Sequence, residues 1–272
     1  MNLVVSINAG YVPPLCVMLR SLLDVQPGCP VTLYIIHSQL TDDDLNLVRT
    51  TVPDEELTVV PVPVSADFLD DAPVLFHFPK EMYYRIFSAQ LLPPDVDRAL
   101  YLDPDMVINR PLWSLYETEM GNSFFAAARA INPITQVEYK HRLEMPEDSE
   151  YFNSGVLLMN LEALRRYQDP EVVLRFIQEN RDKLILPDQD VLNALYHNRT
   201  ILLDPLIYNY DARYYGTIKV GTLGKVDLEW IRENTAIIHY CGKNKPWQDN
   251  YRSEMGVFYE EAARRLYRDK II

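Results

Sequence analysis

The chain has 272 residues, of which 48% are apolar and 24% are charged, proportions that are ordinary for a globular protein. This length suits one large α/β domain, or a domain with a small appendage, and allows a sizeable core. The formal net charge of −13 argues against a nucleic-acid partner, because binding to a phosphate backbone depends on Lys and Arg side chains. An acidic protein that handles a small phosphorylated ligand would need a bound metal ion to mediate the contact.

The start of the chain indicates the expected compartment. Residues 1–7 have no basic region and too short an apolar run for a signal peptide, and no stretch approaches the ~18 apolar residues of a membrane span. The cysteines are Cys16, Cys29 and Cys241, an odd number at scattered spacing that is typical of reduced thiols. We therefore expect a cytoplasmic protein.

Short apolar segments alternate with helical patterns in the first part of the chain. Strands are predicted at residues 3–7, 31–36, 57–62 and 99–102. Pro13 and Pro14 open the first helix, and Thr41 with Asp44 forms a capping box for the second. A loop is expected around Asp70 and Asp71, and a helical segment over about residues 81–92.

The same alternation continues downstream. Residues 151–160 predict a turn into a buried strand, and residues 161–167 predict a short helix. Asp169 and Pro170 form an N-cap and N1 pair for the next helix, and another helix begins near Asp188. Alternating strands and helices predict a mostly parallel sheet that helices cover on both faces, and such sheets bind ligands beyond the carboxyl ends of their strands.

A pair of carboxylates follows the fourth predicted strand, at Asp103 and Asp105. In an extended segment residues i and i+2 project to the same side, and Pro104 biases Asp103 toward the β region. Both carboxylates can therefore converge on a hard divalent cation such as Mn²⁺ or Mg²⁺. Taken alone, the pair is also compatible with a polar turn after a core strand.

Residues 236–247 place a second group of polar side chains after an apolar strand. His239 could complete the ligand shell of a cation, Gly242 would let the backbone approach a phosphate, and Lys245 would supply a positive charge. A histidine considered alone is more often structural. Together with the Pro246-Trp247 pair that follows, the three residues are a much more specific signal.

At this point the chain resembles a known family. The residues that carry the resemblance are Asp103-Pro104-Asp105, Tyr151-Phe152-Asn153-Ser154-Gly155-Val156-Leu157-Leu158-Met159-Asn160, Asp188-Gln189-Asp190 and His239-Tyr240-Cys241-Gly242-Lys243-Asn244-Lys245-Pro246-Trp247. In order and spacing they resemble glycosyltransferase family 8, and within it the bacterial galactosyltransferases and glucosyltransferases that build lipopolysaccharide. The resemblance implies the GT-A nucleotide-diphospho-sugar transferase fold, an α/β fold with a mostly parallel central sheet flanked by helices. It also implies a catalytic domain at residues 1–250 and a C-terminal helical extension at 251–272.

The resemblance further implies a retaining enzyme that takes a hexose from a UDP-sugar, with Mn²⁺ or Mg²⁺ bound. The metal ligands would be Asp103, Asp105 and His239. Residues implied in donor binding are Ser6, Asn8, Arg85, Asp103, Pro104, Asp105, Asn153, Ser154, Asp188, Gln189, His239, Gly242 and Lys245. Among them, Ser6 and Asn8 would border the uridine, Arg85 would reach the donor, and Gly242 and Lys245 would contact the diphosphate. Asn153 and Ser154 would line the sugar pocket.

Two of these residues are implied in catalysis. Asp188 would hold the sugar hydroxyls, and Gln189 would lie beside the anomeric carbon, opposite the leaving group. Because an amide is a poor nucleophile, we favour front-face attack by the acceptor, with the leaving phosphate accepting the proton. The acceptor implied is a cell-envelope glycan or glycolipid such as lipopolysaccharide.

The sequence departs from the family pattern at two places. Asn8-Ala9-Gly10 stands where the galactosyltransferases usually have an acidic pair followed by asparagine. Arg129-Ala130-Ile131 stands where the family often places an aspartate near the sugar. The donor, UDP-galactose or UDP-glucose, therefore stays open.

Several alternatives remain at this stage. Asp103 and Asp105 also fit the nucleophile and general acid of haloacid dehalogenase-type phosphatases, and an inactive UDP-sugar binder is a further alternative. Arg85 could instead pair with a core carboxylate, and Asp188 could be only an N-cap. The basic, aromatic stretch 259–270 is either an ordinary surface helix or a weak peripheral contact with the inner face of the membrane.

Overall fold

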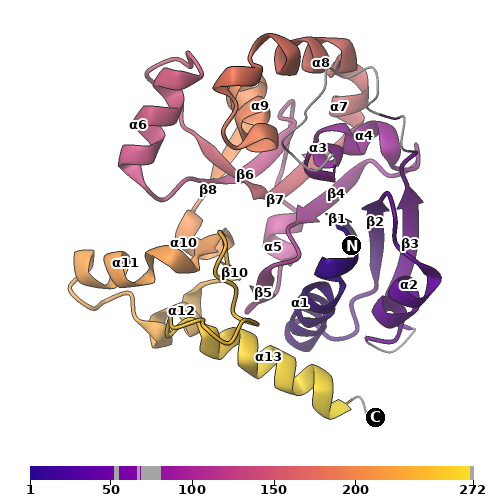
Figure 1. The fold of residues 1–272 in the computed structure, drawn as a ribbon, viewed down its shortest axis with the longest axis vertical. Coiled ribbons are helices and arrows are strands. Elements are labelled where there is room, and N and C mark those ends of the chain that lie inside the picture. Colours follow the sequence, from indigo (N-terminus) through magenta and orange to yellow (C-terminus); the bar gives the residue numbers. More distant parts are fainter. Residues whose placement is uncertain (52–54, 66–67, 69–80, 270–272) are drawn as a thin grey trace.

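A seven-stranded sheet forms the centre of the computed structural model, which describes residues 1–51, 55–65, 68 and 81–269 (Figure 1). The strands run in the order β3-β2-β1-β4-β7-β6-β8. Their bounds are β1 Asn2–Ser6, β2 Val31–His37, β3 Leu57–Pro63, β4 Arg98–Leu102, β6 Phe125–Arg129, β7 Phe152–Asn160 and β8 Thr200–Leu203. The loop expected around Asp70 lies outside the described residues.

The sheet is mostly parallel, as the sequence predicts. Strands β1 to β4 run parallel to one another, and β6 runs parallel to β8. The exception is β7, which is antiparallel to both of its neighbours, β4 and β6. The carboxyl ends of β1 and β4 therefore meet the start of β7 at one edge of the sheet.

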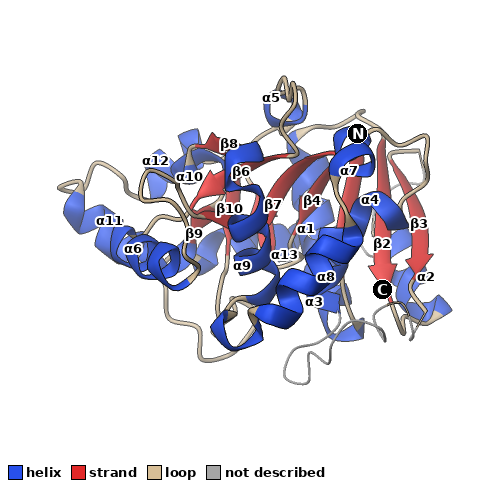
Figure 2. Ribbon diagram, turned by 90° about the horizontal axis from the view of Figure 1, so that it is seen from above, coloured by secondary structure: helices blue, strands red, loops and turns tan. Residues whose placement is uncertain are grey.

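Helices cover both faces of this sheet (Figure 2). The α-helices of the described residues are α1 Val12–Val25, α2 Asp42–Arg49, α3 Glu81–Tyr84, α4 Ser88–Leu91, α5 Trp113–Tyr116, α6 Pro133–Arg142, α7 Leu161–Tyr167, α8 Pro170–Glu179, α9 Pro187–Tyr196, α10 Pro205–Tyr208, α11 Tyr215–Gly221, α12 Leu228–Asn234 and α13 Gly256–Asp269. Along β1 the side chains alternate between two cores: Leu3 and Val5 join the core that contains α1 and α13, and Val4 joins the core that contains α7, α8 and α9. Among the described residues, no helix is long and apolar enough to cross a bilayer.

The helical segment predicted over about residues 81–92 is confirmed, although it is not one regular α-helix. The structure divides this segment into α3, a 3₁₀ turn at Arg85–Phe87, and α4. The Ser88 hydroxyl donates to the Arg85 carbonyl oxygen at 2.9 Å, and this local bond competes with the regular helical pattern. Arg85 begins the 3₁₀ turn at this break, and the residue is 9% exposed.

A second, three-stranded sheet joins distant parts of the chain. It contains β5 Met106–Ile108, β9 Tyr210–Asp211 and β10 Ile237–His239 in the order β5-β10-β9. Strand β5 follows β4 after only three residues, so the small sheet is attached to the edge where the large sheet has its carboxyl ends. This arrangement brings the end of β10 to the segment that links β4 and β5.

Candidate active site

The linker Asp103–Asp105 is held by backbone hydrogen bonds to two different strands. The Asp103 N–H donates to the Gly155 carbonyl oxygen on β7 at 2.8 Å. The Asp105 carbonyl oxygen accepts from the Tyr240 N–H, just after β10, at 3.0 Å. The positions of the two carboxylates are therefore fixed by the backbone of both sheets.

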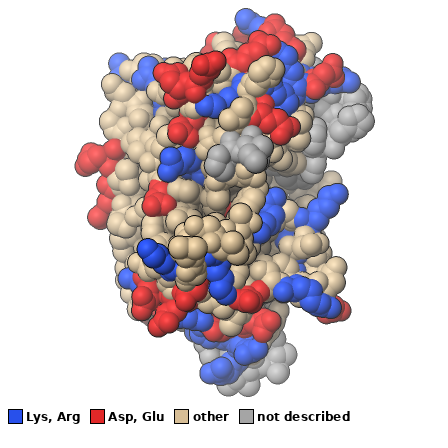
Figure 3. All heavy atoms as spheres, turned by 90° about the vertical axis from the view of Figure 1, so that its left-hand side faces the viewer, with Lys and Arg blue, Asp and Glu red and all other residues tan. Residues whose placement is uncertain are grey.

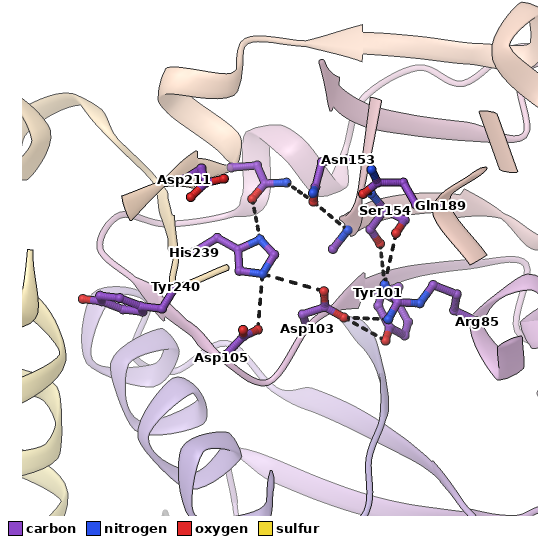
Figure 4. A network of polar contacts seen from close by, with 12 residues as sticks. Arg85, Tyr101, Asp103, Asp105, Asn153, Ser154, Gln189, Asp211, His239 and Tyr240 are labelled. Carbon is purple, nitrogen blue, oxygen red and sulfur yellow. Dashed lines mark hydrogen bonds and ion pairs between the residues drawn. The ribbon is translucent and has the colours of Figure 1, made fainter. Parts of the chain in front are cut away.

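Asp103, Asp105 and His239 converge at this point (Figure 4). One ligand atom from each of the three lies within 4.8 Å of the others. His239 Nε2 is 3.2 Å from Asp105 Oδ1 and 3.7 Å from Asp103 Oδ2. Two carboxylates and an imidazole are a donor set suited to Mn²⁺ or Mg²⁺. The structure thus brings together the three residues that the sequence predicts as metal ligands.

The surroundings fit a metal ion in two ways. His239 Nδ1 is 2.9 Å from Asn209 Oδ1; the amide oxygen can accept only from a protonated Nδ1, so Nε2 is the ring nitrogen that faces the two carboxylates. A Cβ built on Gly155 would lie 2.4 Å from His239 Cε1 and 2.7 Å from Asp103 Oδ2. Any side chain at position 155 would therefore fill the space between the proposed ligands.

Electrostatics keep this cluster charged. Burial alone would raise the pKa of Asp105, but His239 and the Lys245 ammonium, which donates to Asp105 Oδ2, together lower it below its usual value. Burial lowers the pKa of His239, whereas Cys241 and Asp105 raise it and the net shift is upward. A carboxylate that stays ionised is ready to bind a cation without first losing a proton.

Strand β7 bulges beside this cluster. On β6, Ala127 pairs with Leu157 and Arg129 pairs with Phe152, so the intervening residues of β7 have no partner on β6. Bulges of this kind re-aim side chains and are frequent next to active sites. Here the bulge carries Asn153, Ser154 and Gly155 toward the carboxylates.

Arg85 connects the metal-ligand cluster to a second carboxylate, on α9. Its guanidinium lies 3.0 Å from Asp103 Oδ1 and 3.0 Å from Asp188 Oδ2, and donates to the Ser154 carbonyl oxygen at 2.9 Å. The guanidinium also stacks on the ring of Tyr101, at 4.5 Å from the centroid. Burial raises the pKa of Asp188, and Arg85 partly offsets this shift. Arg85 thus pairs with buried carboxylates, as one of the sequence-based alternatives holds.

The side-chain amide of Gln189 is held at both ends. Its Oε1 accepts from the Ser154 N–H at 3.1 Å, and its Nε2 donates to the Tyr151 hydroxyl at 3.0 Å. The Tyr151 hydroxyl in turn donates to Asp190 at 2.6 Å, and Asp190 is fully buried against Arg142. This chain of donors fixes which end of the Gln189 amide points in which direction.

Two clefts meet at the carboxylates. The first, of about 280 Å³, is lined by Ser6, Ile7, Asn8, Tyr11, Met82, Arg85, Asp103, Pro104 and Asp105. The second, of about 430 Å³, contains Arg85, Asp103, Asp105, Asn153, Ser154, Asp188, Gln189, His239 and Gly242 in its lining. The two clefts share Arg85 and both aspartates, so the cluster lies between them. Every predicted donor-site residue except Lys245 therefore lines at least one cleft.

Lys245 is placed differently. Its ammonium contacts Asp105 and donates to the Tyr240 carbonyl oxygen at 2.8 Å, and the residue is only 8% exposed. Its predicted contact with a diphosphate stays a prediction.

Several contributors to the site have no role in the sequence-based prediction. Asn209 orients His239, Tyr101 donates to Asp103 Oδ1 at 3.1 Å, and Tyr151 orients Gln189. Tyr101 is the one with a sequence signal, because it lies two residues before Asp103, which directly follows the same strand, and so faces the same side. Asn209 has none, since it follows a four-residue helix far from His239 in the chain.

The fold is shared with a solved glycosyltransferase. The galactosyltransferase LgtC, in complex with donor and acceptor sugar analogs, superimposes with a TM-score of 0.83 at 23% identity, over 97% of this chain and 96% of that chain. This likeness shows the GT-A fold of the nucleotide-diphospho-sugar transferases, as the sequence predicts.

Proteins with a similar sequence include glycosyltransferases, in agreement with the fold. The chain is 29% identical to general stress protein A of Bacillus subtilis, over 93% of this chain and 91% of that protein. It is also 29% identical to the lipopolysaccharide 1,2-glucosyltransferase of Escherichia coli K12, over 91% of this chain and 72% of that enzyme. The family described as Glycosyl transferase family 8 matches residues 2–251, and the chain belongs to this family. It is therefore a glycosyltransferase, which removes the phosphatase alternative for Asp103.

Proposed function

We propose that the protein is a retaining, metal-dependent hexosyltransferase that moves galactose or glucose from a UDP-sugar to a cell-envelope glycan. One observation carries this proposal: Asp103, Asp105 and His239 lie between two clefts that share both aspartates. A UDP-sugar whose diphosphate contacted a cation there would place its uridine in the cleft lined by Ser6 and Asn8. Its hexose would lie in the second cleft, lined by Asp188, which is called the hexose cleft below.

Asp103, Asp105 and His239 would hold Mn²⁺ or Mg²⁺ in this proposal. A divalent cation at this position would stabilise the negative charge that develops on UDP as the sugar-phosphate bond breaks. Arg85 orients the Asp103 carboxylate through its 3.0 Å ion pair. Gly242 has a φ of +87° and lines the hexose cleft, so its backbone can lie close to the diphosphate.

The side chains of α9 support front-face attack by the acceptor. Asp188 Oδ2 already accepts from the Ser154 hydroxyl at 3.0 Å and pairs with Arg85, which makes it a weak nucleophile and suits it to hold sugar hydroxyls. Gln189, beside the anomeric carbon, cannot form a stable ester. In the proposed route the acceptor hydroxyl attacks on the face of the leaving group, and its proton passes to the departing phosphate oxygen. A covalent sugar trapped on Asp188 would overturn this route.

The acceptor assignment rests on the relatives. They include the lipopolysaccharide 1,2-glucosyltransferase already described and, at 23% identity, a lipopolysaccharide 1,3-galactosyltransferase of Salmonella typhimurium. We extend to this chain an envelope glycan acceptor and a cytoplasmic location. Contact with the inner membrane face through α13 is part of the proposal.

A donor screen tests the proposal. UDP-galactose, UDP-glucose and UDP-N-acetyl sugars are incubated with the protein, with and without Mn²⁺, and hydrolysis and transfer are followed by mass spectrometry. We expect slow hydrolysis of a UDP-hexose that depends on the metal. Activity without metal would contradict the proposed site, and metal-dependent UDP binding with no turnover of any donor would identify an inactive sugar-nucleotide binder.

Asp105→Asn tests the ligand role of this carboxylate. The amide keeps the size of the side chain but removes the negative charge that faces His239 and Lys245, so we expect Mn²⁺-dependent UDP binding to fall at least about 100-fold. Isothermal titration calorimetry with Mn²⁺ and UDP measures the loss. Asp227→Asn is the matched control, because Asp227 caps α12 and asparagine serves equally well there. If Asp105→Asn bound UDP as tightly as the parent protein, the Asp105 carboxylate would not be a metal ligand.

Tyr151→Phe tests the orientation of Gln189. Loss of the hydroxyl frees one end of the amide, and we expect kcat to fall about tenfold or more while KM for the donor changes little. The control is Tyr196→Phe, which removes another buried hydroxyl that accepts from Gln168 at 3.3 Å. Steady-state kinetics of donor turnover give the comparison. Equal kcat values for the two variants would show that the Tyr151 hydroxyl has only a structural role.

A further inference from the structure

A third cleft, of about 590 Å³, opens between α6 and α10. Its lining is Arg129, Ala130, Ile131, Gln136, Val137, Lys140, Glu150, Asp204, Pro205 and Leu206. Arg129, Ala130 and Ile131 also line the hexose cleft, so the two clefts adjoin along the end of β6. Figure 3 looks onto this side of the molecule, where acidic and basic side chains lie around a hollow. A ligand that extends from the hexose cleft past β6 would enter this third cleft.

The charged groups of the third cleft balance one another. Arg129 and Glu150 face each other at 3.9 Å, and their side chains are 53% and 39% exposed. The Lys140 ammonium donates to backbone carbonyl oxygens, at 2.7 Å for Glu147 and 3.0 Å for Ser149, and Asp204 caps α10. With two positive and two negative side chains, the cleft suits a neutral ligand that has many hydroxyl groups, because both donors and acceptors are exposed to it.

Apolar surface lies beside these polar groups. Val137 on α6 is 67% exposed, and Ile131, Pro205 and Leu206 line the same cleft. Ligand sites commonly combine apolar walls with a few placed polar groups. Such a combination matches a sugar ring, which has apolar C–H faces and a rim of hydroxyl groups.

Residues 129–131, which form the wall shared by the two clefts, are held in place by hydrogen bonds. The Ala130 N–H donates to the Tyr151 carbonyl oxygen at 2.9 Å, and the Ala130 carbonyl oxygen accepts from Gln136 Nε2 at 2.8 Å. Gln136 Oε1 accepts in turn from the Tyr151 N–H at 3.3 Å. A wall that is ordered before a ligand arrives lowers the entropic cost of binding.

We propose that this third cleft is a remote subsite for the acceptor, which holds the neutral sugar residue next to the one that receives the hexose. The inference rests on the proposed function and adds a location to it: a second residue of the glycan acceptor would lie in the cleft between α6 and α10. Binding energy from the remote residue then helps to position the attacking hydroxyl.

A chain-length series tests this subsite in the full-length protein with Mn²⁺ and the donor that is turned over. The probes are fluorescently labelled neutral gluco- and galacto-oligosaccharides of one to four residues, and kcat/KM for transfer is measured for each. We expect kcat/KM to rise about tenfold or more on passing from one residue to two or three. In Val137→Asp, which puts a charge on the apolar wall, this gain should largely disappear. The control is Val172→Asp, at an exposed valine on α8 that should keep the gain.

The outcomes separate the two hypotheses. Without Mn²⁺-dependent hydrolysis of any UDP-hexose, the proposed function itself fails. With hydrolysis present, three results overturn the subsite: kcat/KM that does not change with length, a gain that Val137→Asp leaves intact, or no transfer to any oligosaccharide of the series.

Discussion

Gly155→Ala is expected to lower the affinity for Mn²⁺ about 10- to 100-fold and to reduce donor hydrolysis in proportion. The methyl group would lie 2.4 Å from His239 Cε1 and 2.7 Å from Asp103 Oδ2, distances that Cβ atoms do not adopt. One of the two ligands would have to move away from its position. Calorimetry of Mn²⁺ binding and mass spectrometry of UDP-hexose hydrolysis measure the two effects.

Gly216→Ala is the control for this substitution. Gly216 lies in α11, where nothing lies within 4 Å of an added Cβ, and alanine is the better helix former. We expect this variant to bind Mn²⁺ as the parent protein does and to unfold at a slightly higher temperature. If Gly155→Ala also kept full Mn²⁺ affinity, the bulge of β7 would be free to shift and Gly155 would not set the spacing between His239 and Asp103.

Arg85→Met is expected to destabilise the protein by about 3–5 kcal/mol, because it leaves the buried carboxylate of Asp188 and the partly buried carboxylate of Asp103 without the guanidinium that pairs with both. Urea unfolding measures the change. Arg232→Met is the control: the ion pair of Arg232 with Glu261 lies at the surface, where such pairs contribute about 1 kcal/mol or less. Similar losses in the two variants would contradict a specific role for the buried pair.

The loss in Arg85→Met should depend on pH. Burial raises the pKa of Asp188, and removal of the guanidinium raises it further. The folded state then binds a proton more tightly than the unfolded state, so stability falls as pH rises through the raised pKa. The deficit should therefore be smallest below about pH 4, the pKa of an unperturbed aspartate, and grow toward neutral pH. A deficit that grows as the pH falls would contradict this assignment.

The sequence predicts that Asp103, Asp105 and His239 lie near one another because each stands at or just after the end of an apolar strand. Asp103 and Asp105 follow β4, and His239 ends β10, so strand patterns place them at sheet edges. The mostly parallel sheet is predicted for the same reason, since its strands are short, apolar and separated by helices. These features depend on local pattern and on the order of the elements, both of which can be read along the chain.

Features that depend on tertiary contacts could not be predicted. The break at Arg85 is one, because the apolar pattern of residues 81–92 continues through it, and two carboxylates distant in sequence bind its guanidinium. The bulge of β7 is another, because it is defined only by pairing with β6. The placement of Lys245 on Asp105 likewise follows from the meeting of two distant segments.

The three-stranded sheet affects the order of events during synthesis. A nascent chain has all strands of its large sheet once β8 is complete at Leu203, yet His239 has still to be made and paired with β5 through β10. Domains fold as their segments leave the ribosome, so an unfinished chain has the two carboxylates without the imidazole that completes the cluster. The complete three-residue cluster therefore forms only after every strand of the large sheet has been made.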